Sequence, residues 1–482
     1  MHTNNKKLTL QEKELEILRN AVDRVENQVA REKINSPQIK KIIEIVEMFI
    51  RKKKLVCYGG TAINNILPVK DQFYDKTIEL PDYDFFSPNA LSDAKELADI
   101  YYNEGYGDVE AKAGVHKGTF KVFVNFIPVA DITSLDNEIY KIINNEAIVV
   151  NGIKYSPPNF LRMSMYLELS RPNGDVGRWE KILKRLILLN KHYPIKDPNC
   201  DTVNFMRQFE GNPEDQKMIY NIVRNTIINQ GLIFFGGYAS SLYGKYMPKN
   251  RQKQLLQIPD FDVLSEDAET SATIIKENLE AVGIKNVKMK RKEKIGENIP
   301  AHIEVIVDKD TVCFIYEPIA CHSYNKINVK GQSVNVASID TMLSFYLAFL
   351  YSNKPYYDVD RIICMAQYLF EVQARNRLQQ KGLLKRFSIS CYGKQKTLED
   401  SRAEKTNKFK ELKDTRNTKE YEEYFLRYIP GDNKTQSSRL SSKKTTKKSR
   451  KSTKAKKSTK TKKTNKNRKT KKKNILNKLL NI

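Results

Sequence analysis

The chain has 482 residues, which is more than a single hydrophobic core usually holds. It contains 84 Lys and Arg residues against 57 Asp and Glu, a formal charge of +27. The segment from Ser441 to Lys473 holds 18 of these cations and no acid, so the rest carries +9. The excess favours a polyanion, such as nucleic acid or an anionic membrane surface, over a cationic partner. Because 40% of the residues are hydrophobic, the composition excludes a wholly disordered protein.

Neither end of the chain nor its interior suggests a membrane segment. Residues 1–16 are polar and charged where a signal peptide needs an apolar stretch. The longest apolar run, residues 342–351, is about half as long as a membrane span. We therefore expect a soluble protein with no membrane partner. The 6 cysteines include no Cys-x-x-Cys pair and no even framework, which favours a reducing compartment.

The first 54 residues predict two helices. Apolar residues recur at helical spacing, as in Ile39, Ile43, Val46 and Ile50. Between the two helices, Asn35-Ser36-Pro37 provides a stop, an N-cap and a proline suited to the first helical position. We treat residues 1–54 as one N-terminal helical region.

An internal repeat follows these helices. Three strings recur in the same order at offsets of 177, 178 and 180 residues, which predicts a duplicated unit. We call residues 55–195 the first repeat and residues 232–400 the second repeat. The matching strings are Leu55-Val56-Cys57-Tyr58-Gly59-Gly60 with Leu232-Ile233-Phe234-Phe235-Gly236-Gly237, Leu80-Pro81-Asp82-Tyr83-Asp84 with Ile258-Pro259-Asp260-Phe261-Asp262, and Met163-Ser164-Met165-Tyr166-Leu167 with Leu343-Ser344-Phe345-Tyr346-Leu347.

The order of elements within each repeat predicts an α+β fold. A β-rich run ends in Gly-Gly, a helix follows, and the next strand carries Asp-x-Asp. Then come a helix (90–103 or 268–281), a pair of apolar strands and a long helical stretch, so helices interleave with a small mixed sheet. We expect a helical linker over 196–231 and a helical extension over 401–433. The Lys/Ser/Thr-rich tail, 434–482, is too charged to bury a core, and we expect it to be disordered.

Three carboxylates are candidates for chemistry. Side chains alternate faces along a strand, so Asp82 and Asp84 project to the same side, where they repel unless a cation lies between them. Asp131 lies on a further apolar strand and offers a third carboxylate. Hard oxygen ligands suit Mg²⁺ with phosphate oxygens. Such a site lowers the pKa of an attacking hydroxyl and neutralises a departing pyrophosphate, with Asp131 also a candidate general base.

Gly59, Gly60 and Thr61 are candidates for phosphate binding. Two residues without a Cβ atom stand at a strand end before a helix, whose N-cap we expect to be Thr61. Open backbone N–H groups and the helix dipole favour an anion there. The string contains neither a Walker A loop nor a G-x-G-x-x-G fingerprint. Alone, a Gly-Gly turn or an Asp-x-Asp is mostly structural; together, about 20 residues apart, they favour chemistry.

These motifs resemble one known family. The order Gly-Gly, Asp-x-Asp and later Asp is similar to the polymerase β-type nucleotidyltransferase superfamily. Three longer strings resemble the poly(A) polymerase catalytic subunit of poxviruses and giant nucleocytoplasmic DNA viruses, over about residues 30–380. The strings are Tyr58-Gly59-Gly60-Thr61-Ala62-Ile63-Asn64-Asn65-Ile66-Leu67-Pro68, Pro81-Asp82-Tyr83-Asp84-Phe85-Phe86-Ser87-Pro88 and Leu161-Arg162-Met163-Ser164-Met165-Tyr166-Leu167-Glu168-Leu169-Ser170-Arg171-Pro172.

The resemblance implies a function and a set of partners. It implies two tandem nucleotidyltransferase-like units, metal ligation (Mg²⁺ or Mn²⁺) by Asp82, Asp84 and Asp131, and triphosphate contact by Gly60 and Thr61. It implies template-independent addition of adenylate from ATP to an RNA 3′ end, in the host cytoplasm and the virion. Further partners are a second copy of the chain or a processivity subunit. The first repeat starts near residue 55, so we expect the extra N-terminal domain of the poxvirus proteins, and any partner docked on it, to be absent.

The second repeat departs from the pattern. Tyr238 replaces the hydroxyl residue Thr61, and aligning the hairpins sets Phe314 against Asp131. Phenylalanine cannot bind a metal, although a shifted register offers Asp310, with Glu317 nearby. We therefore interpret the second repeat as a degenerate scaffold that narrows an RNA channel.

Two questions stay open from the sequence. A set of basic residues recurs in part at helical spacing, and it is either a solvated face or a groove for RNA or triphosphate. The set comprises Arg162, Arg171, Arg178, Lys181, Lys184 and Arg185. The rivals to the enzyme reading are a non-catalytic RNA-binding scaffold and a nucleotidyltransferase with another nucleotide or acceptor.

Overall fold

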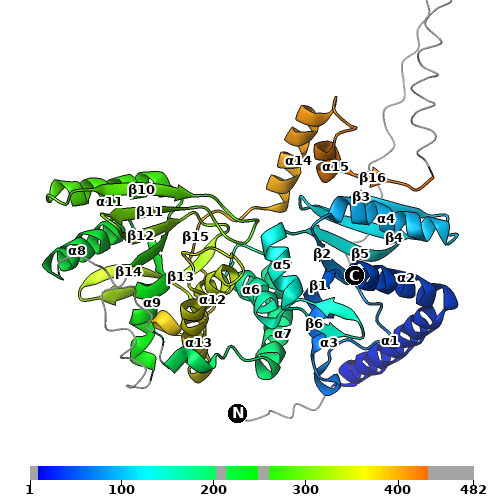
Figure 1. Ribbon diagram of the computed structural model, residues 1–482. Coiled ribbons are helices and arrows are strands. Elements are labelled where there is room, and N and C mark those ends of the chain that lie inside the picture. The colour runs from blue at the N-terminus through cyan, green and yellow to red at the C-terminus, as the bar shows by residue number, and fades with distance from the viewer. Residues whose placement is uncertain (1–8, 202, 204–212, 248–259, 432–482) are drawn as a thin grey trace, which may run out of the picture. The chain divides into compact units, whose positions relative to one another are not determined.

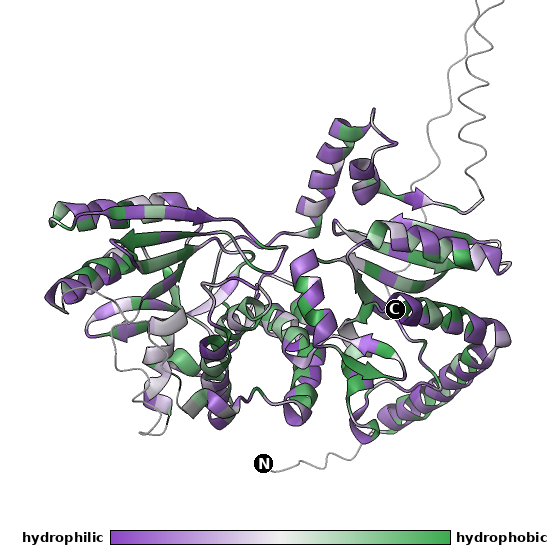
Figure 2. Cartoon of the chain, in the orientation of Figure 1, coloured by the Kyte–Doolittle hydropathy of each residue, from purple (hydrophilic) through white to green (hydrophobic). Residues whose placement is uncertain are grey.

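The computed structural model describes residues 9–201, 203, 213–247 and 260–431. It begins with two helices, α1 (Leu10–Asn35) and α2 (Pro37–Lys53), as the sequence predicts (Figure 1). Ser36 is the N-cap of α2 and accepts a hydrogen bond from the Ile39 N–H, with Pro37 in the first turn. α2 buries an apolar face, whereas α1 buries no residue and is mostly hydrophilic (Figure 2).

The first repeat forms an eight-stranded mixed sheet in the order β16-β3-β4-β5-β2-β1-β7-β6. β16 comes from the C-terminal part of the chain and is described below. The elements of the repeat are β1 (Val56–Cys57), α3 (Gly59–Ile66), β2 (Tyr83–Ser87), α4 (Ala90–Asn103), β3 (Val109–Ala113), β4 (Thr119–Val124), β5 (Ile127–Ser134), α5 (Asn137–Asn145), β6 (Ile148–Val150), β7 (Ile153–Tyr155), α6 (Pro158–Leu169) and α7 (Trp179–His192).

The second repeat forms another eight-stranded sheet, in the order β10-β11-β12-β9-β8-β14-β13-β15. Seven strands of each sheet follow the same order, so the duplication read from three short strings extends to the topology. The helix α8 (Pro213–Asn229) lies in the linker before this repeat. The elements of the repeat are β8 (Ile233–Phe235), α9 (Gly236–Tyr243), β9 (Phe261–Leu264), α11 (Ala268–Ala281), β10 (Val287–Lys292), β11 (His302–Val307), β12 (Asp310–Tyr316), β13 (His322–Val329), β14 (Gln332–Ala337), α12 (Ile339–Phe349), α13 (Val359–Arg375) and β15 (Cys391–Tyr392).

The two repeats pack together through their corresponding helices. α6 of the first repeat contacts α12 of the second, and every residue of α12 is buried. The Ser323 N–H at the start of β13 donates a 2.7 Å hydrogen bond to the carbonyl of Ser170, just after α6. The mixed sheets with helices packed on them confirm the α+β class.

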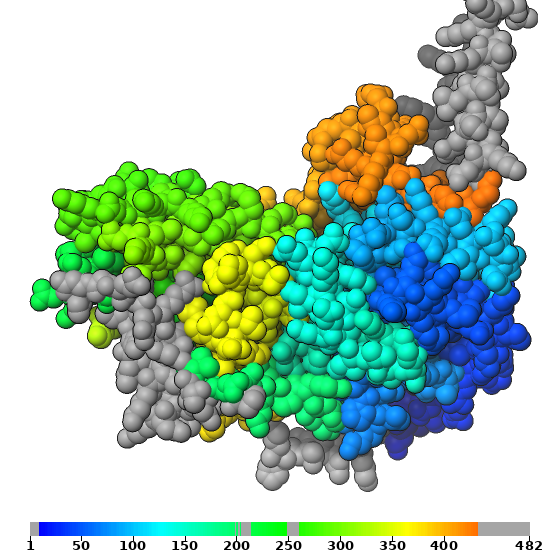
Figure 3. All heavy atoms as spheres, viewed as in Figure 1, coloured from blue at the N-terminus to red at the C-terminus, as the bar shows by residue number. Residues whose placement is uncertain are grey.

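The C-terminal extension returns to the first repeat, which the sequence did not predict. It contains α14 (Leu398–Leu412), α15 (Lys419–Phe425) and β16 (Arg427–Tyr428), and β16 pairs antiparallel with β3. The Lys95 ammonium binds the Glu422 carboxylate at 2.7 Å, and the Tyr428 hydroxyl donates to Asp99 at 2.6 Å. In Figure 3 the orange extension rests on the blue surface of the first repeat. The tail, 434–482, lies outside the described residues.

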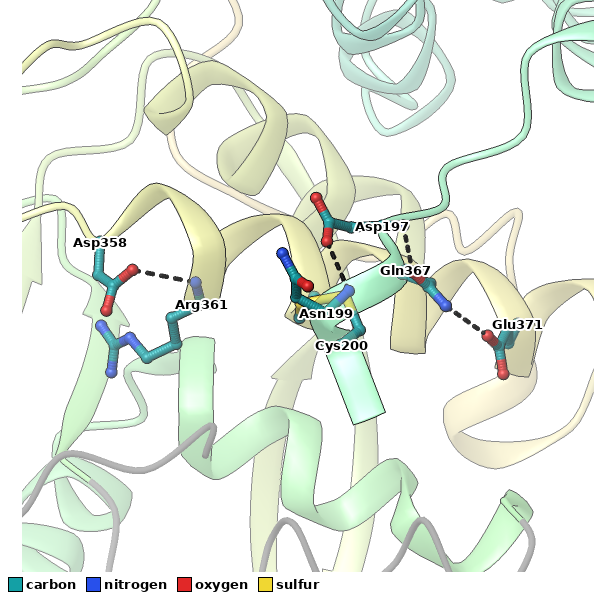
Figure 4. Close-up of a disulfide and its surroundings, with 8 residues drawn as sticks. Asp197, Asn199, Cys200, Asp358, Arg361, Gln367 and Glu371 are labelled. Atoms are coloured by element: carbon teal, nitrogen blue, oxygen red, sulfur yellow. Dashed lines mark hydrogen bonds between the residues drawn. A yellow bond between two sulfur atoms is a disulfide. The ribbon is translucent and has the colours of Figure 1, made fainter. Parts of the chain in front are cut away.

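Two disulfides correct the expectation of reduced thiols. Cys200 pairs with Cys364 of α13, and Cys321 pairs with Cys391 of β15. Beside the first bond, the Gln367 side chain accepts a hydrogen bond from the Asp197 N–H and donates one to Glu371 (Figure 4). The partners are 164 and 70 residues apart in sequence, so spacing gave no sign of the pairing.

The described helices also bear on membrane insertion. Within the described ranges, no helix is both long enough and apolar enough to cross a bilayer.

Candidate active site

The three predicted carboxylates lie together at the start of β2. β2 and β5 are parallel neighbours, and their register places Asp84 directly opposite Asp131. Asp82 immediately precedes β2 and has the same facing as Asp84 along the chain. A motif from one strand and a single acid 47 residues later therefore form one cluster.

The cluster holds more negative charge than its surroundings balance. Burial, then the charges of Asp82 and Asp131, raises the pKa of Asp84 from 3.8 to about 7. Burial, then the Asp131 charge, also raises the pKa of Asp82. A divalent cation would relieve this repulsion.

Lys121 is a member of the site that the sequence reasoning missed. It lies opposite Asp131 on the antiparallel neighbour β4, and its ammonium forms an ion pair with Asp131 Oδ2. The sequence could have indicated this contact, because pairing the two apolar strands as an antiparallel hairpin sets Lys121 opposite Asp131. A lysine between a Phe and a Val on an alternating strand reads, however, as an ordinary solvent-facing residue.

The three carboxylates suit a hard divalent metal, although the described residues contain no preformed metal site. In the described residues, no group of three or more His, Cys, Asp and Glu side chains is arranged as a ready metal site. Asp131 instead pairs with the Lys121 ammonium, and Asp82 and Asp84 are two further carboxylates close enough to raise one another's charge repulsion. Such oxygens are the ligands that Mg²⁺ and Mn²⁺ prefer.

The Gly-Gly turn closes tightly on the carboxylates. Gly59 has φ +73°, and a Cβ atom there would lie 2.6 Å from Asp84 Oδ2. The N-cap residue of α3, Tyr58, provides no side-chain hydrogen bond to the helix. The N–H groups of the first turn, including those of Gly60 and Thr61, therefore lack a capping side chain beside the cluster.

The structure corrects the expected role of Thr61 as the N-cap. The positive φ of Gly59 turns the chain directly into α3, so the helix begins three residues earlier than predicted. Thr61 is buried in the first turn, and its hydroxyl donates a 2.7 Å hydrogen bond to the carbonyl of Asp82. Thr61 thus ties the Gly-Gly turn to the Asp-x-Asp strand.

Arg185 of α7 approaches the same turn from the opposite side. Its guanidinium is 2.9 Å from the position of a Cβ atom on Gly60, and it donates a 2.6 Å hydrogen bond to the Tyr74 hydroxyl. The group also lies over the rings of Phe73 and Tyr74, 5.0 and 5.5 Å from their centroids. A buried, stacked arginine beside open N–H groups suits an anion with several oxygens.

The six basic residues separate into different roles. Arg162 is buried and bonds to the Asn159 side chain and the Tyr193 carbonyl, so its role is structural. Lys181 and Lys184 are exposed, as expected for a solvated helix face. Arg178 is close enough to Asp84 to oppose the rise in its pKa, and it pairs with Glu168 at 3.3 Å.

The second repeat lacks the third acid. Phe314 of β12 lies opposite Asp262 of β9, at the register position that Asp131 holds opposite Asp84, which confirms the predicted alignment. The space beside Asp260 and Asp262 is a cavity of about 20 Å³, walled by Tyr316, Tyr346, Phe349 and Tyr357. Mostly aromatic side chains, together with Arg361, therefore line the position that corresponds to the candidate site of the first repeat.

The first repeat therefore carries a carboxylate cluster of the kind that nucleotidyltransferases use, and the second repeat has Phe314 in place of its third acid. Residues 44–175 match the family model described as poly(A) polymerase catalytic subunit. The match over this segment confirms the resemblance drawn from the sequence motifs.

Curated relatives and a solved structure agree with the match. A protein of African swine fever virus, provisionally named poly(A) polymerase catalytic subunit, is 35% identical over 167 residues, covering 33% of this chain and 35% of the relative. A protein of Acanthamoeba polyphaga mimivirus with the same name is 32% identical over 203 residues, 41% of this chain and 33% of the relative. The chain thus spans about a third of these relatives. The Megavirus polyadenylate synthase has the same fold, with a TM-score of 0.75 at 20% identity over 93% of this chain and 92% of that one.

Proposed function

We propose that the protein adds adenylate residues from ATP to the 3′ end of RNA without a template. The observation that carries the proposal is the register pair of Asp84 and Asp131 beside the Gly-Gly turn. The second repeat has Phe314 at the equivalent position, so we assign the reaction to the first repeat alone.

The residues of the first repeat have distinct roles in this reaction. The N–H groups of Gly60 and Thr61 and the Arg185 guanidinium bind the triphosphate of ATP. A side chain at position 59 would occupy the space of Asp84 Oδ2, so the glycine there lets the turn lie close to the carboxylates. Thr61 fixes the distance between the phosphate seat and the carboxylates through its bond to the Asp82 carbonyl.

The chemical step is an in-line displacement. The RNA 3′-oxygen bonds to the α-phosphorus, the bond to the β-phosphate oxygen breaks, and pyrophosphate leaves. Asp131 accepts the proton of the 3′-hydroxyl, and the Lys121 ammonium forms an ion pair with this carboxylate in the structure. Asp82, Asp84 and Asp131 would hold Mg²⁺ or Mn²⁺, which supplies charge neutralisation at the reacting phosphates.

Incubating the purified full chain with labelled RNA, Mg²⁺ or Mn²⁺ and each nucleoside triphosphate separately tests the proposal. We expect long extension with ATP alone. Extension with another nucleotide would favour the rival transferase, and RNA binding without extension would favour the non-catalytic scaffold. Asp108→Asn, at an exposed acid between α4 and β3, is the matched control for Asp84→Asn in the same assay.

The family resemblance also supports partners and a location as parts of the proposal. We expect a second copy of the chain or a processivity subunit to accompany the enzyme, and light scattering of the purified chain distinguishes the first case. We expect the protein in the host cytoplasm and the virion, which immunolabelling of infected cells would test.

A further inference from the structure

A second polar cavity lies where the end of α6 meets the second repeat. Its volume is about 260 Å³, and residues from both repeats line it. Leu167 and Arg171 come from the first repeat, and Lys294, Glu297, Glu317 and Ile319 come from the second. The catalytic carboxylates do not line it.

Arg171 brings an uncompensated positive charge to this cavity. Its Nε donates a 3.2 Å hydrogen bond to the Leu167 carbonyl, which leaves the two terminal nitrogens for another partner. Within the described ranges, no carboxylate forms an ion pair with Arg171. The acid next to it in the fold, Glu168, pairs with Arg178 instead. Burial lowers the pKa of the Arg171 guanidinium, which nonetheless stays charged at neutral pH.

The acids that line the cavity already have cationic partners. Glu297 pairs with Lys294 at 3.1 Å, and Glu317 pairs with Arg291 at 2.8 Å. The cavity therefore presents a net positive charge from Arg171 together with an apolar wall at Ile319, which is 38% exposed. This combination suits an anion attached to a less polar group.

A short series of electrostatic contacts links the cavity to the carboxylate cluster. The Arg178 charge opposes the rise in the pKa of Asp84, and Arg178 forms an ion pair with Glu168. The Arg171 charge in turn opposes the rise in the pKa of Glu168. Arg171 is thus linked electrostatically to the carboxylate cluster through Glu168 and Arg178. An anion at Arg171 would be outside the reacting centre and still within reach of a strand whose end occupies it.

We propose that this cavity binds a phosphodiester group of the RNA strand, upstream of the 3′ end that reacts. The inference rests on the proposed function, since it needs an RNA strand in the site. An arginine fork recognises a phosphate through two hydrogen bonds and carries no sequence information, which suits an enzyme that extends any RNA. The sugar attached to that phosphate contacts the Ile319 wall.

RNA affinity as a function of oligonucleotide length tests this site. Full-length protein is titrated without ATP, by fluorescence anisotropy, against labelled RNAs from 2 to about 12 nucleotides. We expect the affinity of the wild type to increase once the strand is long enough to reach Arg171. In Arg171→Gln that increase should fall by about tenfold, and the salt slope for long RNA should decrease by about 0.7.

Variants on the opposite wall keep the test independent of the fold around Arg171. Ile319→Glu places a carboxylate beside Arg171 and should cause the same length-dependent loss, whereas the uncharged Ile319→Gln should not. Arg19→Gln removes one charge from the exposed face of α1 and should leave RNA binding unchanged. Melting curves verify that each variant is folded.

Three results would overturn the inference. The first is an equal affinity of Arg171→Gln and wild type for long RNA. The second is a loss that is the same for dinucleotides and long strands, which would place Arg171 in the reacting centre. The third is a weakened affinity for ATP alone with RNA binding intact, which would assign the cavity to the nucleotide. A wild type that binds RNA but adds no adenylate would overturn the proposed function instead.

Discussion

The guanidinium of Arg185 lies against Gly60, 2.9 Å from the position of a Cβ atom on that residue. Arg185 is in the last helix of the first repeat, and Gly60 is in the Gly-Gly turn of the same repeat, 125 residues earlier. Phe73 and Tyr74, from the loop between α3 and β2, hold the guanidinium there by stacking and by one hydrogen bond. The proposed triphosphate site is therefore built from three distant parts of the chain.

Replacing Arg185 with Gln should lower kcat/KM for ATP by about 100-fold, because a charge-assisted contact to the triphosphate is lost at the reacting end. The neighbouring Lys184→Gln is the matched control, since Lys184 is exposed and pairs only with Glu180 on its own helix at 2.6 Å. Steady-state rates at saturating RNA and varied ATP measure both variants. Equal values for Arg185→Gln and Lys184→Gln would contradict the assignment.

Asp84→Asn should stabilise the protein at pH 8 when no divalent cation is present. The folded-state pKa of Asp84, about 7, is above its ordinary 3.8, so ionising this carboxyl destabilises the fold. That destabilisation is absent below about pH 4, where the group is protonated in both states, and it grows as the pH rises to 7. Melting temperatures of wild type and variant should therefore coincide near pH 4 and diverge by pH 8.

Mg²⁺ or Mn²⁺ should raise the melting temperature of the wild type at pH 8 more than that of Asp84→Asn, because the metal offsets the repulsion that Asn already removes. Asp108→Asn, in an exposed loop, controls for the loss of one negative charge. A variant that is less stable than wild type at pH 8 and equally responsive to metal would refute the account of the cluster.

The two repeats should differ in their response to loss of acids. Asp82→Ala or Asp84→Ala should abolish RNA extension while leaving RNA binding nearly intact, because these acids act on charge at the reacting phosphates. Asp260→Ala combined with Asp262→Ala should keep most of the extension activity. Gel-based extension assays and RNA-binding titrations on folded variants measure whether the loss is confined to the first repeat. Equal loss in both sets would show that the second repeat takes part in the chemistry.

The sequence predicted the parts of the site that lie close together along the chain. Gly-Gly and Asp-x-Asp are local motifs, and the repeat itself supplied the register that sets Phe314 opposite Asp262. Thr61 was misassigned because an N-cap is the usual role of a threonine at a helix start, and the left-handed φ of Gly59 moved that start. Neither motif contains information about the backbone angle of a single glycine.

Several contacts between distant segments were not predicted from the sequence. The ion pair of Lys121 with Asp131 depends on which strands are neighbours, and the pairing of β16 with β3 joins residues more than 300 positions apart. The disulfide partners Cys321 and Cys391 meet only because β15 adds to β13. Each contact follows from the completed sheets rather than from any local pattern.

Removing residues 434–482 should weaken RNA binding and leave single-nucleotide addition at saturating RNA largely unchanged, because no carboxylate or Gly-Gly residue is lost. The segment from Ser441 to Lys473 carries 18 cations without an acid, so its affinity for RNA comes from counterion release. If about a third of these cations engage at once, the slope of log K against log salt should fall by roughly 4 units. A full-length variant with Gln in place of these Lys and Arg residues separates charge from length, and it should behave like the truncated chain. RNA affinities at several salt concentrations provide the measurement, and indistinguishable slopes for the three proteins would leave targeting or solubility as the role of the tail.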